Sequence, residues 1–361
     1  MNIKQVYPDI GSIELDYLSS SINNKWLTEG PLCKKFISKM KSITKAKYAV
    51  LAPNGTLGLY LGLLALNLKP NSEVIIPSFT FYASAMAVYF AGLKPVFVDV
   101  DPDNYNINIE KTKKLINKNT SAIMPVHVYG QSADMTALNN LCKENKIKII
   151  EDAAQGCGVH FKGKHTGTIG DVGVISFFAD KTITMGEGAI ILTNNKKTFE
   201  RLNLLRNQGR PNSGTFKHPS LGMNFRITDL QAGIGCAQLD KISQIIDSRK
   251  KNHEIYIQQL GECEKLTLHK PTPGSEYIPF RLALTSKFKN KIMANLENAG
   301  VQTRSFFYPM HLQPQLKKYK RNTDMSISEK LFNTGVCLPI HNNLNEKQIK
   351  RISKIVLSSF K

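Results

Sequence analysis

Short apolar runs alternate with amphipathic segments from about residue 48 to residue 193, at lengths typical of strands and helices. Six apolar runs predict strands at residues 73–77, 94–100, 121–126, 148–151, 172–177 and 189–193. The spacing of apolar positions between them predicts helices over residues 56–68, 82–91, 109–117 and 134–145. The predicted strands are nearly continuous hydrophobic runs, as in a parallel sheet with both faces covered. The pattern therefore predicts an α/β fold built from βαβ units.

The pattern changes after residue 209, where a loop rich in Pro, Asn, Ser and Gly covers residues 210–220. Thr228 and Gln231 then have the spacing of a capping box, which predicts the start of a long helical stretch. That stretch continues to about Leu260 and would lead into a second unit. We therefore expect a large domain over residues 1–240 and a smaller mixed α/β domain over residues 241–361.

The chain is strongly basic, with a net charge of +20 over 361 residues. A nucleic-acid binder is one interpretation of such a charge, and it predicts salt-sensitive retention on DNA. However, the lysines are spread in short groups and are not interleaved with aromatic residues. We therefore predict no nucleic-acid partner. A basic surface near a binding site would instead attract an anionic substrate that carries phosphate.

The six cysteines are widely spaced, and none forms a C-x-x-C pair. This predicts reduced, mostly buried thiols and no metal site. The first twelve residues have no apolar segment of the kind found in signal peptides, and no run approaches the length of a membrane span. We therefore expect a soluble cytoplasmic protein with no membrane partner.

Asp152 directly follows the predicted strand at residues 148–151. In open α/β sheets, ligands bind at the carboxyl ends of the strands. A carboxylate at the end of a buried strand needs a positive partner, and a protonated pyridine nitrogen would serve. The simpler alternative is that Asp152 caps a following helix.

Lys181 lies 29 residues after Asp152 in apolar surroundings, between Phe178 and Ile183. Desolvation lowers the pKa of a lysine and makes its amine a usable nucleophile. The alternative is an ordinary surface lysine with its stem against the protein. Gly186 and Gly188 indicate a tight loop beside a ligand, or a plain hairpin turn.

Gly55 and Thr56 follow a short apolar run and open a predicted helix, whose free N–H groups suit a phosphate. The alternative is that Asn54 simply caps that helix. Ser176, at the end of another strand, could supply a second phosphate donor. Phe81 could stack on a cofactor ring or belong to the core.

Other chemistries lack their motifs, because no H-E-x-x-H, G-x-S-x-G or P-loop sequence occurs. His127 and His311 could act as bases or contact a substrate, although a single histidine is more often structural.

Six segments occur together in this order: residues 54–56, 77–81, 126–131, 151–155, 176–188 and 222–229. In this combination the chain resembles the DegT-type nucleotide-sugar aminotransferases, from about Trp26 to the C-terminus. These are fold-type I enzymes that depend on pyridoxal 5'-phosphate (PLP). The resemblance implies a large domain with a mostly parallel sheet flanked by helices, plus a smaller C-terminal α/β domain.

The resemblance also implies roles for individual residues. Lys181 would carry PLP as a Schiff base and move the reacting proton, and Asp152 would pair with the ring nitrogen. The other implied contacts are Gln155 near the phenolic oxygen, Phe81 against the ring, and Gly55, Thr56 and Ser176 at the phosphate. Asn224 would reach the PLP phosphate of a neighbouring subunit, which implies a homodimer with shared active sites. Candidates for the amino-donor and sugar sites are Trp26, Arg226, Tyr308 and His311.

The type of reaction follows from the lysine and the residues after it. Related dehydratases carry His where this chain has Lys181, so transamination is favoured. Residues 181–188 resemble the perosamine-synthase-like members, which aminate a 4-keto sugar. The implied function is transfer of an amino group from L-glutamate to C4 of a nucleotide-linked 4-keto-6-deoxy sugar, for surface polysaccharide such as O-antigen. The alternatives are amination at C3 or of another keto-sugar nucleotide, and an inactive regulator of the same fold.

Overall fold

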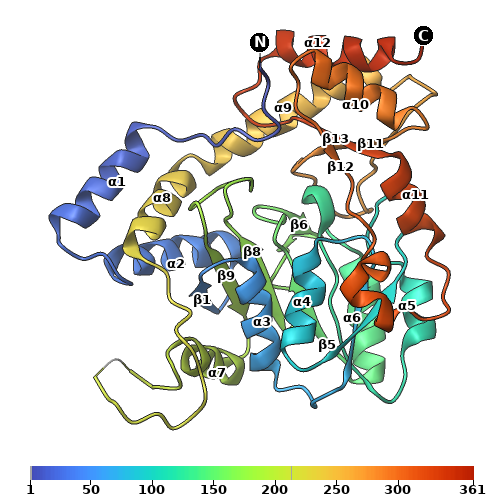
Figure 1. Ribbon diagram of the computed structural model, residues 1–361. Helices are drawn as coiled ribbons and strands as arrows, with labels where there is room; N and C mark the ends of the chain where they lie inside the picture. Colours follow the sequence, from blue (N-terminus) through green and yellow to red (C-terminus); the bar gives the residue numbers. More distant parts are fainter. Residues whose placement is uncertain (1, 213) are drawn as a thin grey trace.

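A seven-stranded sheet lies at the centre of the larger part of the chain in the computed structural model, which describes residues 2–212 and 214–361 (Figure 1). Its strands, in spatial order, are β1 (Tyr48–Ala52), β9 (Ala189–Thr193), β8 (Val172–Ser176), β5 (Lys148–Asp152), β4 (Thr120–Ile123), β2 (Glu73–Pro77) and β3 (Lys94–Val98). The pairs from β8 to β3 are parallel, and β9 runs antiparallel to both of its neighbours. The predicted mostly parallel sheet is confirmed.

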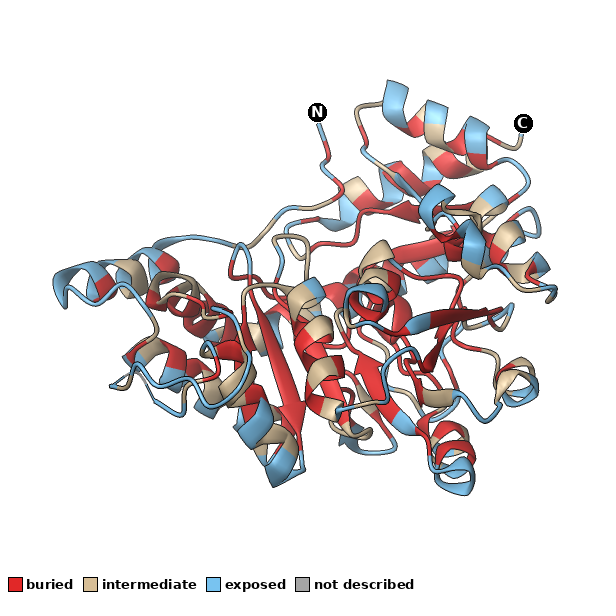
Figure 2. Ribbon diagram, turned by 60° about the horizontal axis from the view of Figure 1, so that its bottom comes forward, coloured by how far each residue is buried: buried red, intermediate tan, exposed pale blue. Residues whose placement is uncertain are grey.

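Helices cover both faces of this sheet. Val50 and Ala52 of β1 pack with helices α3 (Gly55–Leu66) and α4 (Tyr82–Phe90). Ala49 and Leu51 point the other way and pack with α2 (Pro31–Thr44) and α8 (Asp229–Asp240). This part of the chain also contains the helices α1 (Ser12–Asn23), α5 (Ile109–Leu115), α6 (Met135–Asn145) and α7 (Lys196–Arg206). A separate two-stranded sheet is formed by β6 (His160–Phe161) and β7 (Lys164–His165). Buried residues therefore fill the strands and the inner helix faces (Figure 2).

The C-terminal part forms a second, smaller sheet with its own core. Its strands, in spatial order, are β10 (Thr267–Leu268), β11 (Leu282–Thr285), β13 (Gly335–Leu338) and β12 (Arg304–Ser305). Its helices are α9 (Ile242–Leu260), α10 (Lys289–Asn298), α11 (Ser326–Thr334) and α12 (Glu346–Ser358). The N-terminal residue Ile3 belongs to the same core and pairs with Val301. Both ends of the chain therefore lie on this unit (Figure 1).

The predicted strands 73–77 and 189–193 agree with β2 and β9 residue for residue, and the other predicted elements shift by a few residues at their ends. The capping box of Thr228 and Gln231 is present at the start of α8. The long helical stretch is interrupted at Lys241, between α8 and α9. Helices α1, α2 and α7 were not predicted. The domain boundary after residue 240 stays a prediction.

Five of the six cysteines are buried, as predicted, and Cys263 is partly exposed. Across residues 2–212 and 214–361, no helix has the length and apolar character needed to cross a membrane.

Candidate active site

The carboxyl ends of β5 and β8 and the first turn of α3 meet at a cavity of about 480 Å³, a size common for small-molecule sites. Segments of the C-terminal unit, including Arg281, Arg304 and Phe307, form its other wall. The cavity brings together seven of the residues predicted to hold a cofactor, namely Gly55, Thr56, Phe81, Asp152, Gln155, Ser176 and Lys181.

Asp152 is the last residue of β5, and its side chain is almost completely buried at the cavity. Its carboxylate accepts hydrogen bonds from the Ser84 hydroxyl at 2.7 Å and from the Ala154 N–H at 3.2 Å. No helix follows it, so the alternative role as a helix cap is not what the fold shows. Burial raises the pKa of the Asp152 carboxyl, and within the described residues it forms no ion pair. The site therefore has a buried carboxylate suited to a cationic ring nitrogen.

Lys181 lies in the loop that joins β8 to β9, with its side chain 15% exposed. It is therefore not the ordinary surface lysine that was the alternative. Burial lowers the pKa of its amine, which favours the neutral, nucleophilic form. The Nζ atom lies 3.4 Å from Asp180 Oδ1 and 4.8 Å from the centre of the Phe280 ring.

The end of the cavity at α3 has the features of a phosphate site. Asn54 caps the helix by accepting a hydrogen bond from the Leu57 N–H at 3.0 Å. The N–H groups of Gly55 and Thr56 have no acceptor within the described chain, so the positive end of the helix opens into the cavity. A Cβ at residue 55 would lie 3.0 Å from Ser176 Cβ, so glycine keeps this end open.

The middle of the cavity is lined by groups that could face an aromatic ring. The Tyr129 N–H donates to Gln155 Oε1 at 2.6 Å, which fixes the amide at the cavity wall. Phe81 is 61% exposed, so most of its ring is free to be covered by a ligand.

These groups fit PLP. The amine, the buried carboxylate and the open helix end lie around one cavity, as the aldehyde, ring nitrogen and phosphate of PLP require. When bound, PLP supplies the electron sink that allows an amino group to leave one carbon and join another. Lys181 would hold it and move protons, Asp152 would keep the ring nitrogen protonated, and residues 55, 56 and 176 would bind the phosphate.

A buried, hydrogen-bonded pair of side chains supports the end of β5 that carries Asp152. Glu151 and His127 are both fully buried, with Glu151 Oε2 2.9 Å from His127 Nε2. His127 Nδ1 accepts from the Ala133 N–H, so its neutral form carries the proton on Nε2. Its main-chain N–H donates to the Asp152 carbonyl. His127 is therefore a structural residue that helps to fix the end of β5.

Five predicted site residues lie outside the cavity. Asn224 forms a backbone bridge with Asn207, to which the Arg226 guanidinium also donates. Trp26 and Tyr308 are 52% and 41% exposed, and any role for these four in substrate or cofactor binding stays a prediction. His311 is fully buried. Its ring nitrogens form hydrogen bonds with the Ser78 hydroxyl at 2.6 Å and with the Glu329 carboxylate at 3.0 Å. In this chain His311 joins two elements and does not reach the cavity.

A charged cluster that was not predicted from the sequence lies opposite the cofactor residues. Asp180 Oδ2 lies 2.7 Å from Arg281 Nη2 and 3.6 Å from Arg304 Nη1. Arg281 sits on the Phe280 ring, with its guanidinium carbon 4.6 Å from the ring centre. A charged residue inside the apolar run 278–284 was a usable signal, since a buried charge requires a partner.

A lysine amine, a buried aspartate and a helix N-terminus around one cavity, on this sheet, are what a PLP-dependent enzyme requires. The model of the DegT/DnrJ/EryC1/StrS aminotransferase family matches residues 8–357. The chain therefore belongs to this family.

No group of three or more His, Cys, Asp or Glu side chains in the described residues could hold a metal ion.

Similar proteins cover almost the whole chain. The GDP-perosamine synthase of Vibrio cholerae is 33% identical over 359 residues, which is 98% of each chain. The UDP-N-acetyl-3-dehydro-alpha-D-glucosamine 3-aminotransferase of Acidithiobacillus ferrooxidans is 31% identical over 88% of this chain and 86% of its own. The crystal structure of the aminotransferase TlmJ from Streptoalloteichus hindustanus has a TM-score of 0.94 at 26% identity, over 100% of this chain and 99% of its own.

Proposed function

We propose that this aminotransferase moves the amino group of L-glutamate to C4 of a nucleotide-linked 4-keto-6-deoxy sugar, for the synthesis of surface polysaccharide. The observation that carries the proposal is the arrangement of Lys181 and Asp152 in one cavity that opens toward Arg304. The side chain of Arg304 is 56% exposed, so it is available to an anionic substrate. The similarity to a GDP-perosamine synthase over 98% of both chains supports a sugar nucleotide as the acceptor.

The proposed roles follow from the environment of each group. Lys181 would accept the proton from Cα of the amino donor, because burial lowers the pKa of its amine and favours the neutral base. Asp152 keeps the ring nitrogen protonated from its buried position at the end of β5. Gly55, Thr56 and Ser176 hold the phosphate, which anchors the ring while the amino group moves.

A second candidate acceptor is a 3-keto sugar nucleotide, and the 31% identity to a 3-aminotransferase favours it. The same lysine and aspartate would serve either reaction. The position of the keto group relative to the nucleotide would then decide which carbon reaches Lys181.

We further propose that two copies of the chain form a homodimer that shares its active sites. The segment between α7 and α8 extends from the body of the molecule (Figure 1). It exposes Phe216, Leu221 and Met223 to the extent of 93%, 91% and 60%. Apolar side chains this exposed favour burial against a partner. Asn224 follows directly in sequence, and contact with the second copy's PLP phosphate would explain why it lies outside its own cavity.

The test is an absorbance spectrum of purified protein with added PLP, before and after L-glutamate. Wild type should show a visible band that glutamate bleaches, and a 4-keto sugar nucleotide should restore it. Lys181→Ala should lack this cycle, whereas Lys196→Ala, which removes an exposed lysine on α7, should behave as wild type. Restoration by a 3-keto sugar nucleotide alone would move the reaction to C3. A wild type without the band would refute the assignment of Lys181.

A further inference from the structure

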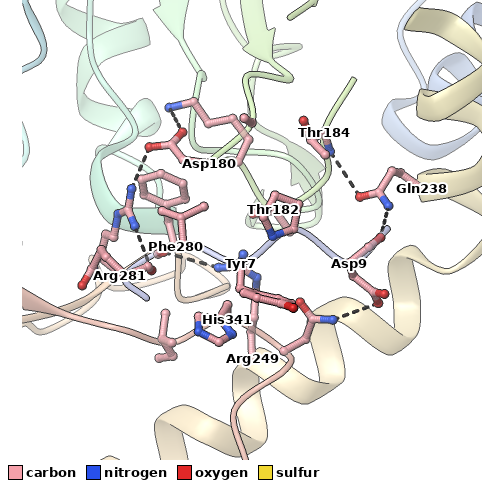
Figure 3. Close-up of a pocket in the computed structure, with 17 residues that line it drawn as sticks. Tyr7, Asp9, Asp180, Thr182, Thr184, Gln238, Arg249, Phe280, Arg281 and His341 are labelled. Carbon is pink, nitrogen blue, oxygen red and sulfur yellow. Dashed lines mark hydrogen bonds and ion pairs between the residues drawn. The ribbon is translucent and has the colours of Figure 1, made fainter. Parts of the chain in front are cut away.

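The free amine of Lys181 has a defined resting position. Figure 3 shows Asp180, Phe280 and Arg281 together at a pocket that is also lined by Lys181. Its Nζ lies 3.4 Å from Asp180 Oδ1 and 4.8 Å above the Phe280 ring. The two contacts come from different parts of the chain, because Phe280 precedes β11 in the C-terminal unit. The amine is therefore held between the two units.

The carboxylate of Asp180 is itself fixed in direction. Oδ2 accepts from Arg281 Nη2 at 2.7 Å, and the Arg281 guanidinium lies on the Phe280 ring. Arg281 Nη1 also donates to the Gln5 carbonyl at 3.5 Å. Oδ1, in contrast, is buried and has no hydrogen-bond partner within the described residues. One oxygen is thus used to hold the carboxylate, and the other faces Lys181.

This arrangement would hold the lysine in place while it is not bonded to the cofactor. In PLP-dependent transamination, the lysine is released from the cofactor for part of each cycle. A released lysine on a flexible stem loses side-chain freedom when it is ordered, and that loss opposes a fixed position. A buried charge partner and an aromatic face both offset that cost.

We propose that Asp180 and the ring of Phe280 form a docking position for the released amine of Lys181, which makes Asp180 a positioning residue. The inference rests on the assignment of Lys181 as the cofactor lysine. While it is released, the amine rests against Asp180 Oδ1, at the wall of the cavity that would hold the cofactor.

The charges around the amine determine whether a substitution at residue 180 raises or lowers the pKa of Lys181. The carboxylates of Asp180 and Asp152 favour the ammonium form, whereas burial and the Arg281 charge favour the neutral amine. The other ionisable groups that line the two pockets beside Lys181 are Tyr7, Asp9, Tyr129, Glu187, Arg249, Arg304, Cys337 and His341. Of these, Arg304 pairs with Asp180 and Arg249 interacts with its charge, so the loss of the carboxylate leaves both cations less neutralised and acts in the same direction on Lys181. Removing the Asp180 charge should therefore lower the pKa of the Lys181 amine.

The experiment uses the full-length protein without cofactor. Trace labelling with acetic anhydride between pH 6 and 10, followed by peptide mass spectrometry, gives the pH at which Lys181 becomes reactive. In Asp180→Asn that pH should fall by about one unit or more, since a neighbouring carboxylate commonly shifts a pKa by that amount. Labelling at a pH where the amine is mostly protonated should rise about tenfold. Asp180→Glu, which keeps the charge, should return the profile toward wild type.

Glu346→Gln is the matched control, because it removes a carboxylate that pairs with Lys350 at 2.6 Å on α12. It should leave the Lys181 profile unchanged. A folded Asp180→Asn protein whose Lys181 profile overlays that of wild type would overturn the proposal. If this variant does not fold, a crystal structure of cofactor-free wild type decides, because Nζ must lie within about 4 Å of Oδ1 for a salt bridge. Neither measurement needs PLP, so failure of the proposed reaction would be seen separately in the absorbance test.

Discussion

Glu151 offers a sharp test of how the fold holds the active site. Its Oε1 accepts hydrogen bonds from the N–H groups of Ile169 and Gly170 at 2.7 and 2.6 Å. Its Oε2 accepts from the Gly167 N–H at 2.7 Å and from His127 Nε2 at 2.9 Å. Although burial alone would raise it, these hydrogen bonds hold the pKa of the Glu151 carboxyl below its ordinary value. Each oxygen of one carboxylate therefore receives two donors.

Glu151→Gln keeps the size of the side chain but turns one oxygen into an NH2 group. In either orientation of the amide, two N–H donors would then face another donor. His127 cannot relieve this by moving its proton to Nδ1, because the Ala133 N–H already donates there. Two lost hydrogen bonds to a charged group cost about 3–6 kcal/mol.

The assay is urea unfolding of the cofactor-free protein at pH 7.5, followed by circular dichroism. A loss of about 3–6 kcal/mol would remove much of the 5–15 kcal/mol typical of a folded protein, so the variant should be only marginally folded. Glu144→Gln changes an exposed carboxylate on α6 and should stay within about 0.5 kcal/mol of wild type. A Glu151→Gln protein within about 1 kcal/mol of wild type would refute the reasoning.

Two further predictions concern stability. Burial lowers the pKa of His165 and His269 to about 4. As the pH falls from about 6.5 toward 4, these histidines take up protons in the unfolded chain before they do so in the folded one. Each should therefore reduce the free energy of unfolding by up to about 3 kcal/mol across that window. Thermal unfolding from pH 7.5 to 4.5 should show this loss, and a glutamine at either position should reduce its slope if the histidine is responsible. A Cβ at Gly173 would lie 2.2 Å from the backbone of Gly167, so Gly173→Ala should lower the free energy of unfolding by about 3 kcal/mol or more, measured by thermal unfolding. A Cβ at Gly11 would have no atom within 4 Å, so Gly11→Ala should change stability little. An unchanged Gly173→Ala protein would mean that the two backbones separate easily.

The large sheet and its side of the cavity could be predicted from the sequence because their signals are local. Apolar runs such as residues 73–77 mark the strands, and the residues that follow a parallel strand gather at one edge of the sheet. Asp152 and Lys181 could therefore be placed together without a structure. The direction of β9 could not be predicted from the sequence, because a buried antiparallel strand has the same apolar pattern as a parallel one.

The opposite wall of the cavity could not be predicted in this way. Arg281 and Arg304 lie about a hundred residues or more after Asp180, and only the packing of the two units brings them together. His311 shows the same limit, because its partners Ser78 and Glu329 decide its role and neither is near it in sequence. Partners in distant segments determine what such side chains do.

The placement of Ile3 has a consequence for how the protein is made. Its N–H donates to the Gly300 carbonyl at 2.7 Å, and its own carbonyl accepts from the Gln302 N–H at 2.9 Å. The ribosome produces this segment first and its partners about three hundred residues later. At 5–20 residues per second, the delay is roughly 15–60 s. During that interval the large sheet has time to assemble, so joining the first residues to the C-terminal unit becomes a late step of folding, and a fusion placed before Ile3 would interfere with that step first.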